Sequence, residues 1–328
     1  MNLSSETSFL SLPKYEFHCH LNGSFHDNSV RKYIQNDVIT EINQNLTSDK
    51  FFRILKHFNS ILINQFDNLS EILEEIIIHN KNQNCIYLEI RDSPRIGKSL
   101  TIEKYITKTY EILKDLQIKH KEIILQFIIS LHRASDFYDK NIEIVNYLKQ
   151  MPPQYKDFIS CIDFSGDQKS QKLPFSNYYN MFAELQNCGF KLTFHCFEYE
   201  DDECFEDILR LKPFRISQCF NLNDRDKIDS LIKSKVPLEI CPTAAEIFTG
   251  KNIKEFENYK YLIRENHPLL LGSDSTCLMN TSIVEEYEKF SKLFNGKVED
   301  LEQNVMINSK KYIIDDTFYQ HMNNNSFI

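Results

Sequence analysis

The chain has 328 residues, of which 41% are hydrophobic and 26% charged, and its formal net charge is −9. This composition is that of a globular protein with a full core, and the interspersed acidic and basic residues argue against nucleic-acid binding. No apolar run reaches the ~20 residues that span a bilayer, and the polar start lacks the apolar segment of a signal peptide. The nine cysteines are scattered without a C-x-x-C pair, so we expect free thiols and a cytoplasmic protein with no membrane partner.

The first element is expected at residues 15–24, a short buried strand with the sequence YEFHCHLNGS that ends in a loop. Side chains alternate faces along a strand, so His18 and His20 point the same way and can bind one metal ion. Two histidines hydrogen-bonded at a strand end are the alternative interpretation.

Residues 29–82 are predicted to be mostly helical, because apolar residues recur every three or four positions in 48–64 and 70–82. Beyond them, apolar runs typical of strands alternate with helical segments. The predicted strands span 85–91, 122–131, 158–164, 190–195, 214–217, 236–241 and 268–272. The predicted helices span 101–120, 136–150, 175–188, 202–211, 224–234, 253–265, 283–294 and 301–320.

Eight apolar strands, each followed by a helix, indicate a parallel sheet that is buried on both faces. This number of strands favours a closed (β/α)8 TIM barrel of the α/β class, with extra helices after the first strand and at the C-terminus. An open doubly wound sheet is the alternative. No linker or shift in composition divides the chain, so we expect one domain over residues 1–328, with flexible termini at 1–11 and 322–328.

The candidate site lies where the strands of such a barrel end, because the carboxyl ends carry the chemistry. Three histidines and Asp274 form a ligand set suited to zinc or another divalent ion, with a position left for water. An ion acidifies that water into a nucleophile, and Glu198 can move protons between the water and the group attacked. These residues predict metal-assisted hydrolysis without naming a substrate. The polar residues at the strand ends are His18, His20, Arg91, Asp163, Gly166, His195, Glu198, Gln218, Thr243 and Asp274.

Several of these residues stand in motifs that resemble a known family. The pattern LPKYEFHCHLNGS at 12–24 is followed by YLEIRDSPR at 87–95, DFSGD at 163–167 and HCFE at 195–198. PLEICPT at 237–243 and Ser273-Asp274 complete the series. In this order the motifs resemble the adenosine deaminase family. The Asn-Gly-Ser ending of the first motif is closest to its adenosine deaminase-like branch, which deaminates 6-methylamino-purine nucleotides such as methylated AMP.

The resemblance implies roles for individual residues. One metal ion, zinc in the family, would be bound by His18, His20, His195 and Asp274. Glu198 matches the proton donor to the purine ring, Gly166 a backbone contact to the base, and Asn22 the residue that faces the 5′ end of the ribose. The reaction implied is hydrolytic deamination at carbon 6 of adenosine, AMP or methylated AMP.

The chain departs from the family pattern at four places. Gln218 stands where the family has a histidine that orients the attacking water, and Ser275 stands where it has a second aspartate that contacts the nucleophile and the purine. The bulky Phe197 replaces a small residue and could enter the substrate pocket. Thr243-Ala244-Ala245 replaces T-S-N.

Three functional hypotheses fit these residues. The first is an active deaminase of adenine nucleosides or nucleotides with a rearranged proton relay. The second is a catalytically inactive barrel that serves as a structural or scaffolding subunit with protein partners. The third is a metal hydrolase with another substrate. A pocket that is open above the metal site favours the first or third hypothesis, and a pocket filled by Phe197 favours the second.

Overall fold

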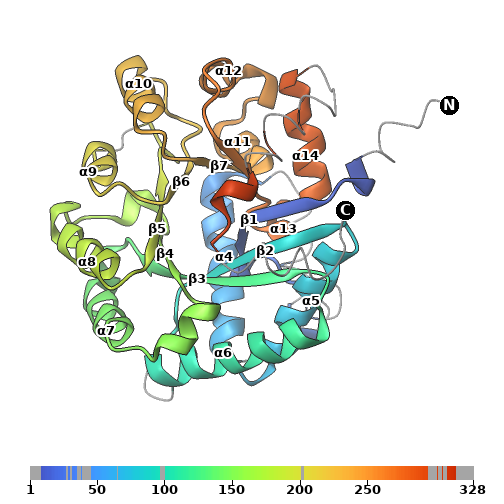
Figure 1. Cartoon of the computed structure of the whole chain (residues 1–328), viewed down its shortest axis with the longest axis vertical. Helices are drawn as coiled ribbons and strands as arrows, with labels where there is room; N and C mark the ends of the chain where they lie inside the picture. Colours follow the sequence, from blue (N-terminus) through green and yellow to red (C-terminus); the bar gives the residue numbers. More distant parts are fainter. Residues whose placement is uncertain are drawn as a thin grey trace.

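The computed structural model describes residues 9–26, 29, 32–34, 38, 46–64, 66–96, 100–200, 203–294, 301, 305 and 309–314. Eight parallel strands pair in sequence order, and Figure 1 shows helices arranged around them. The strands are β1 Lys14–His20, β2 Cys85–Asp92, β3 Ile124–His132, β4 Cys161–Ser165, β5 Lys191–Cys196, β6 Arg215–Gln218, β7 Leu238–Ile240 and β8 Leu269–Leu271.

The helices follow the strands along the chain, with an enlarged first connection. After β1 come α4 Ser48–Asn64 and α5 Leu69–Lys81, as predicted for the region 29–82. The others are α6 Ile102–Lys119, α7 Tyr138–Leu148, α8 Ser176–Asn187, α9 Phe205–Arg210, α10 Arg225–Ser234, α11 Pro242–Thr249, α12 Glu257–Arg264, α13 Thr276–Met279 and α14 Ile283–Ser291. The predicted TIM-barrel architecture is confirmed.

The barrel closes between its first strand and the residues that follow its last. The Asp274 amide donates to the His18 carbonyl at 2.6 Å, and the His20 amide donates to the Asp274 carbonyl at 2.7 Å. The buried Glu16 carboxylate adds a second link, because it accepts from the His18 amide and from Ser273. An open doubly wound sheet is excluded by this closure and by the strand order. Closure therefore brings residues 18–20 and 274 together.

Buried apolar faces hold the helices against the barrel. The α5 positions Ile72, Leu73, Ile76 and Ile77 are fully buried, and they form the stripe that the three-and-four spacing predicted. Along β3 only the two end residues are partly exposed, as expected for a strand covered on both faces. The packing thus follows directly from the apolar pattern of the sequence.

Helices α11 and α13 were not predicted. Helix α11 begins with Pro242 at its first position and ends at Gly250 in the left-handed conformation with φ 71°, which are ordinary start and stop signals. The single helix predicted at 253–265 is divided, because Phe256 has non-helical dihedrals between a 3-10 turn at Ile253–Glu255 and α12.

Other predictions fall partly outside the described residues. This holds for most of the helix at 301–320 and for most of the termini at 1–11 and 322–328, although Phe9 is buried. All nine cysteines are free thiols, as expected. Among the described residues, no helix combines the length and apolar character needed to cross a membrane.

Candidate metal centre and catalytic pocket

Three histidine side chains meet at the carboxyl end of the barrel. The Nε2 atom of His20 lies 3.1 Å from Nε2 of His18 and 3.2 Å from Nε2 of His195. These spacings are compatible with one shared ion at the ~2.0–2.1 Å that zinc keeps from imidazole nitrogens. β1 supplies His18 and His20 and β5 supplies His195, so the three histidines that the sequence singled out lie together.

Carboxylates fix the orientation of two of these rings. Nδ1 of His18 is 2.7 Å from Glu239 Oε2, and Nδ1 of His195 is 2.9 Å from Asp163 Oδ1. An ionised carboxylate only accepts, so each Nδ1 carries a hydrogen and the Nε2 atom of each ring faces the shared centre. Burial also lowers the pKa of His18 well below its usual value, which favours the neutral, metal-binding form.

Asp274 approaches the same centre from the segment after β8. One of its oxygens lies within 4.8 Å of a His18 ring nitrogen and of the Cys241 sulfur. Its carboxylate accepts from Gln218 Nε2 at 2.8 Å and from Ser275 Oγ at 2.8 Å. The structure therefore places Asp274 beside His18, one of the three histidines, and in contact with both Gln218 and Ser275. This donor set fits a divalent ion such as zinc.

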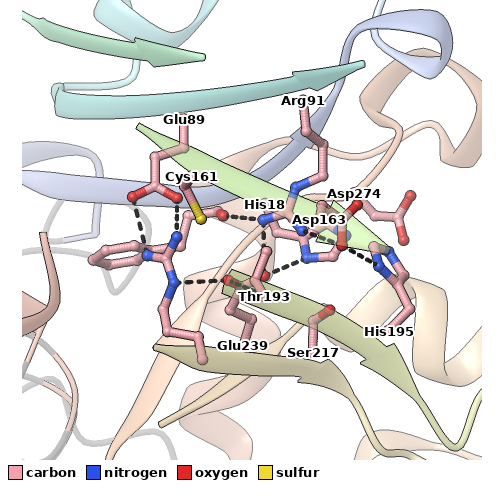
Figure 2. Close-up of polar contacts among 12 residues, drawn as sticks. His18, Glu89, Arg91, Cys161, Asp163, Thr193, His195, Ser217, Glu239 and Asp274 are labelled. Carbon is pink, nitrogen blue, oxygen red and sulfur yellow. Dashed lines mark hydrogen bonds and ion pairs between the residues drawn. The ribbon is translucent and has the colours of Figure 1, made fainter. Parts of the chain in front are cut away.

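A buried ionic network supports the histidines from inside the barrel (Figure 2). Glu239 accepts hydrogen bonds from the Arg91 guanidinium at 2.8 Å and from Thr193 at 3.1 Å, in addition to its contact with His18, and its carboxylate forms an ion pair with Arg215 at 2.9 Å. Arg91 also lies 3.7 Å from Asp163, and the two buried side chains form an interior ion pair. Because every one of these side chains is buried, the network fixes the metal-binding rings in a rigid setting.

Glu198 follows β5 and faces the space above the histidines. A pocket lies there whose space, open solvent included, amounts to about 620 Å³. Glu198 Oε2 has no hydrogen-bond partner among the described residues. The lining residues are His20, Asn22, Phe51, Phe52, Leu55, Asn59, Ser93, Arg95, His132, Ser165, Gly166, His195, Glu198, Phe248, Asp274 and Ser275.

Burial raises the pKa of Glu198 to about 7, because a charged carboxylate loses hydration there. Burial also raises the pKa of Glu16 to about 8 and that of Glu286 to about 7. We expect carboxyl-carbon NMR of metal-free protein to show, besides these two, a glutamate titrating near neutral pH that is missing from Glu198→Gln. The acid is then protonated below that pH and loses its proton above it. A Glu198 signal titrating near pH 4 would contradict this prediction.

Gly166 and His132 form one wall of the pocket. Gly166 has φ 107°, and an added Cβ would lie 2.9 Å from His132 Nε2, so glycine is required both by the backbone and by the ring. The Ala134 amide donates to His132 Nδ1 at 3.1 Å, which leaves the hydrogen of the neutral ring on Nε2. His132 was not singled out from the sequence, although its position at the end of a predicted strand was a usable signal.

Of the three other residues predicted to contact the substrate, one lines the pocket and two do not. Asn22 lines the pocket and donates to Asn59 at 2.8 Å. Phe197, by contrast, is buried against Phe205 and is absent from the pocket lining. The Thr243 hydroxyl is likewise absent from the lining and donates to the buried Glu286 carboxylate.

The pocket lining also contains phenylalanines that no sequence motif indicated. Phe51, Phe52 and Phe248 contact one another edge to face and form an apolar side. Arg95 also lines the pocket, where it forms an ion pair with the buried Asp92 and donates to Asn59 at 2.6 Å and to the Ser93 carbonyl at 2.8 Å. The pocket is thus lined by an apolar group of phenylalanines, by the Arg95 guanidinium and by histidines of the candidate metal centre.

Comparisons with known proteins agree with this geometry. The family model described as adenosine deaminase matches residues 13–317. N6-Methyl-AMP deaminase of Danio rerio is 24% identical over 317 residues, covering 90% of this chain and 88% of that protein. Adenosine deaminase of Clostridium botulinum (strain Kyoto / Type A2) is 26% identical over 320 residues, covering 89% and 90%. The structure of arabidopsis ADAL complexed with GMP superposes with a TM-score of 0.83 at 21% identity, covering 97% of each chain, a likeness in fold.

Proposed function

Because the chain belongs to the adenosine deaminase family, whose model matches residues 13–317, we propose that it is a metal-dependent hydrolase that deaminates carbon 6 of a purine nucleotide. AMP and N6-methyl-AMP are the proposed substrates. The observation that carries the proposal is the open pocket in which Glu198 faces the centre formed by the three histidines. The direct test is the chromatographic detection of IMP after zinc-loaded protein is incubated with either nucleotide.

His18, His20, His195 and Asp274 would hold zinc, which supplies a Lewis acid that makes water nucleophilic near neutral pH. Glu198 is placed to give a proton to the purine ring as water attacks, since its raised pKa keeps part of it protonated near pH 7. The backbone of Gly166 lies beside His132, where the flat edge of a base can approach closely. The apolar wall excludes water from the reacting face.

The position of Phe197 bears on whether the site is usable. Its ring packs against Phe205 in the core, with a centroid distance of 5.1 Å, and leaves the pocket open. This arrangement supports an enzyme over a catalytically inactive structural subunit, for which a filled pocket was the expected sign. The three histidines and Glu198, which match the family pattern, also support an enzyme over an inactive subunit.

Arg95 supports a nucleotide over a nucleoside as the substrate. It is the arginine of the pocket lining, and it lies with Asn22, Asn59 and Ser93, which offer further polar groups. Guanidinium groups bind phosphate oxygens by charge-assisted hydrogen bonds. The likeness in fold to arabidopsis ADAL, which was complexed with GMP, agrees with a phosphate at this end of the pocket.

We expect Arg95→Ala to raise KM for AMP by about 10- to 100-fold, because a hydrogen bond to a charged group contributes roughly 1.5–3 kcal/mol. Turnover of adenosine should change little, since it has no phosphate. Steady-state kinetics with both substrates measure the difference, and Arg53→Ala on the exposed face of α4 is the matched control. An equal loss for AMP and adenosine would place Arg95 outside the phosphate site.

A further inference from the structure

The two residues that replace the family's histidine and second aspartate act on one carboxylate. Gln218 Nε2 donates to Asp274 Oδ2, and Ser275 Oγ donates to Asp274 Oδ1, both at 2.8 Å. All three side chains are buried, with 1%, 1% and 6% of Gln218, Ser275 and Asp274 exposed. Each carboxylate oxygen therefore has one neutral donor and keeps a further lone pair for a cation.

The backbone of Gln218 is fixed by residues of α12. Tyr259 donates to the Gln218 carbonyl at 2.9 Å, and Asn258 donates to the Cys219 carbonyl at 3.0 Å. Gln218 and Cys219 have φ values of 74° and 52°, a left-handed conformation that costs non-glycine residues about 1–2 kcal/mol each. Such strain persists only where surrounding contacts impose it. These contacts therefore fix the backbone from which the side-chain amide of Gln218 reaches Asp274.

Ser275 is held just as closely from the other side. A Cβ added at Gly23 would lie 2.3 Å from Ser275 Oγ, so the turn after β1 packs directly on this hydroxyl. Asp274 itself has φ 62° and is joined to β1 through the backbone bonds that close the barrel. Gly23 and the closing backbone bonds therefore fix the position of Ser275 beside the Asp274 carboxylate.

We propose that Gln218 and Ser275 are positioning residues that form a neutral, two-donor clamp and orient Asp274 as the fourth ligand of the divalent cation. Both donors are uncharged, so the clamp fixes the carboxylate and leaves its negative charge for the cation. The site thereby keeps a fixed fourth ligand without the imidazole and carboxylate of the family pattern. The inference rests on the metal ion of the proposed function, but zinc binding tests it separately from turnover.

The experiment measures zinc dissociation constants of the full chain by competition with a chromophoric chelator. We expect Gln218→Met and Ser275→Ala each to weaken zinc binding by about 10- to 100-fold, the usual cost of losing a partner of a metal ligand. Gln218→His keeps a donor and should bind zinc nearly as tightly as the native chain. Because both residues act through one carboxylate, the double variant should lose no more than Asp274→Ala.

Controls separate positioning from a general structural role. The unfolding midpoint of each metal-free variant is compared with that of the native chain, and Gln150→Leu in the exposed turn after α7 is the surface control. If Gln218→Met does not fold, the smaller change Ser275→Ala still decides the question. Native zinc affinity in both folded variants overturns the clamp, as does native affinity in Asp274→Ala. Tight zinc binding without turnover would instead overturn the proposed function and leave the clamp standing.

Discussion

Replacing Glu198 by glutamine is expected to lower kcat for AMP deamination by about 10²–10⁴-fold, the usual contribution of a positioned acid or base. The amide has nearly the same shape as the carboxyl group but cannot supply a proton. Glu198 is buried beside the metal centre, and its Oε2 has no other partner among the described residues. KM and zinc affinity should change little, because this side chain donates in the transition state rather than holding the ion.

The control for this variant is Glu200→Gln, the same change two residues later at an exposed position. It should leave kcat within about twofold of the native value, since surface changes of this kind rarely disturb a site. Steady-state kinetics on zinc-loaded proteins compare the two variants. Equal kcat values for Glu198→Gln and the native chain would remove Glu198 from the proposed mechanism.

The largest effect on stability is expected for Glu239→Gln. The Glu239 carboxylate is fully buried, forms ion pairs with Arg91 and Arg215, and accepts from His18. Removing its charge leaves Arg91 and Arg215 buried with fewer counter-charges, and breaking a buried pair in this way costs about 3–5 kcal/mol. His18 also loses the partner that fixes its ring, so zinc affinity should fall by about 10–100-fold.

Urea unfolding of the metal-free protein measures the free energy of unfolding, and chelator competition measures the zinc affinity. Glu184→Gln is the matched control, because its ion pair with Lys149 is half exposed and such pairs contribute only about 0–1 kcal/mol. A free energy of unfolding within 1 kcal/mol of the native value, on the order of a surface pair, would show that the interior network does not depend on Glu239.

The metal ligands could be predicted because each stands at the end of an apolar strand. Parallel strands of a barrel finish at one rim, so His18, His195 and Asp274 had to meet once the alternation of strands and helices was recognised. Their carboxylate partners were harder to predict. Glu239 reaches His18 across 221 positions of sequence, and nothing in the local pattern of either strand encodes that pairing.

The pocket wall and the Asp274 contacts could not be predicted for a related reason. Phe52 and Arg95 come from separate connections whose approach depends on how α4 lies over the barrel. Gln218 reaches Asp274 because both residues adopt left-handed backbone conformations, which L residues seldom adopt and which a motif of side chains does not reveal. The position of Phe197 could not be predicted for the same reason. Its backbone is left-handed, with φ 50°, and its ring is buried in the core and is absent from the pocket lining.

The most direct test of the proposed function is turnover of AMP and N6-methyl-AMP by the native, zinc-loaded protein, with IMP separated by chromatography. We predict IMP from at least one nucleotide, at a rate that falls when zinc is removed and returns when it is restored. Gln218→His/Ser275→Asp, which restores the family pattern, is assayed beside it. The proposed function would be contradicted if the native chain binds zinc but forms no IMP while the double variant does form IMP. That result would indicate a non-catalytic protein.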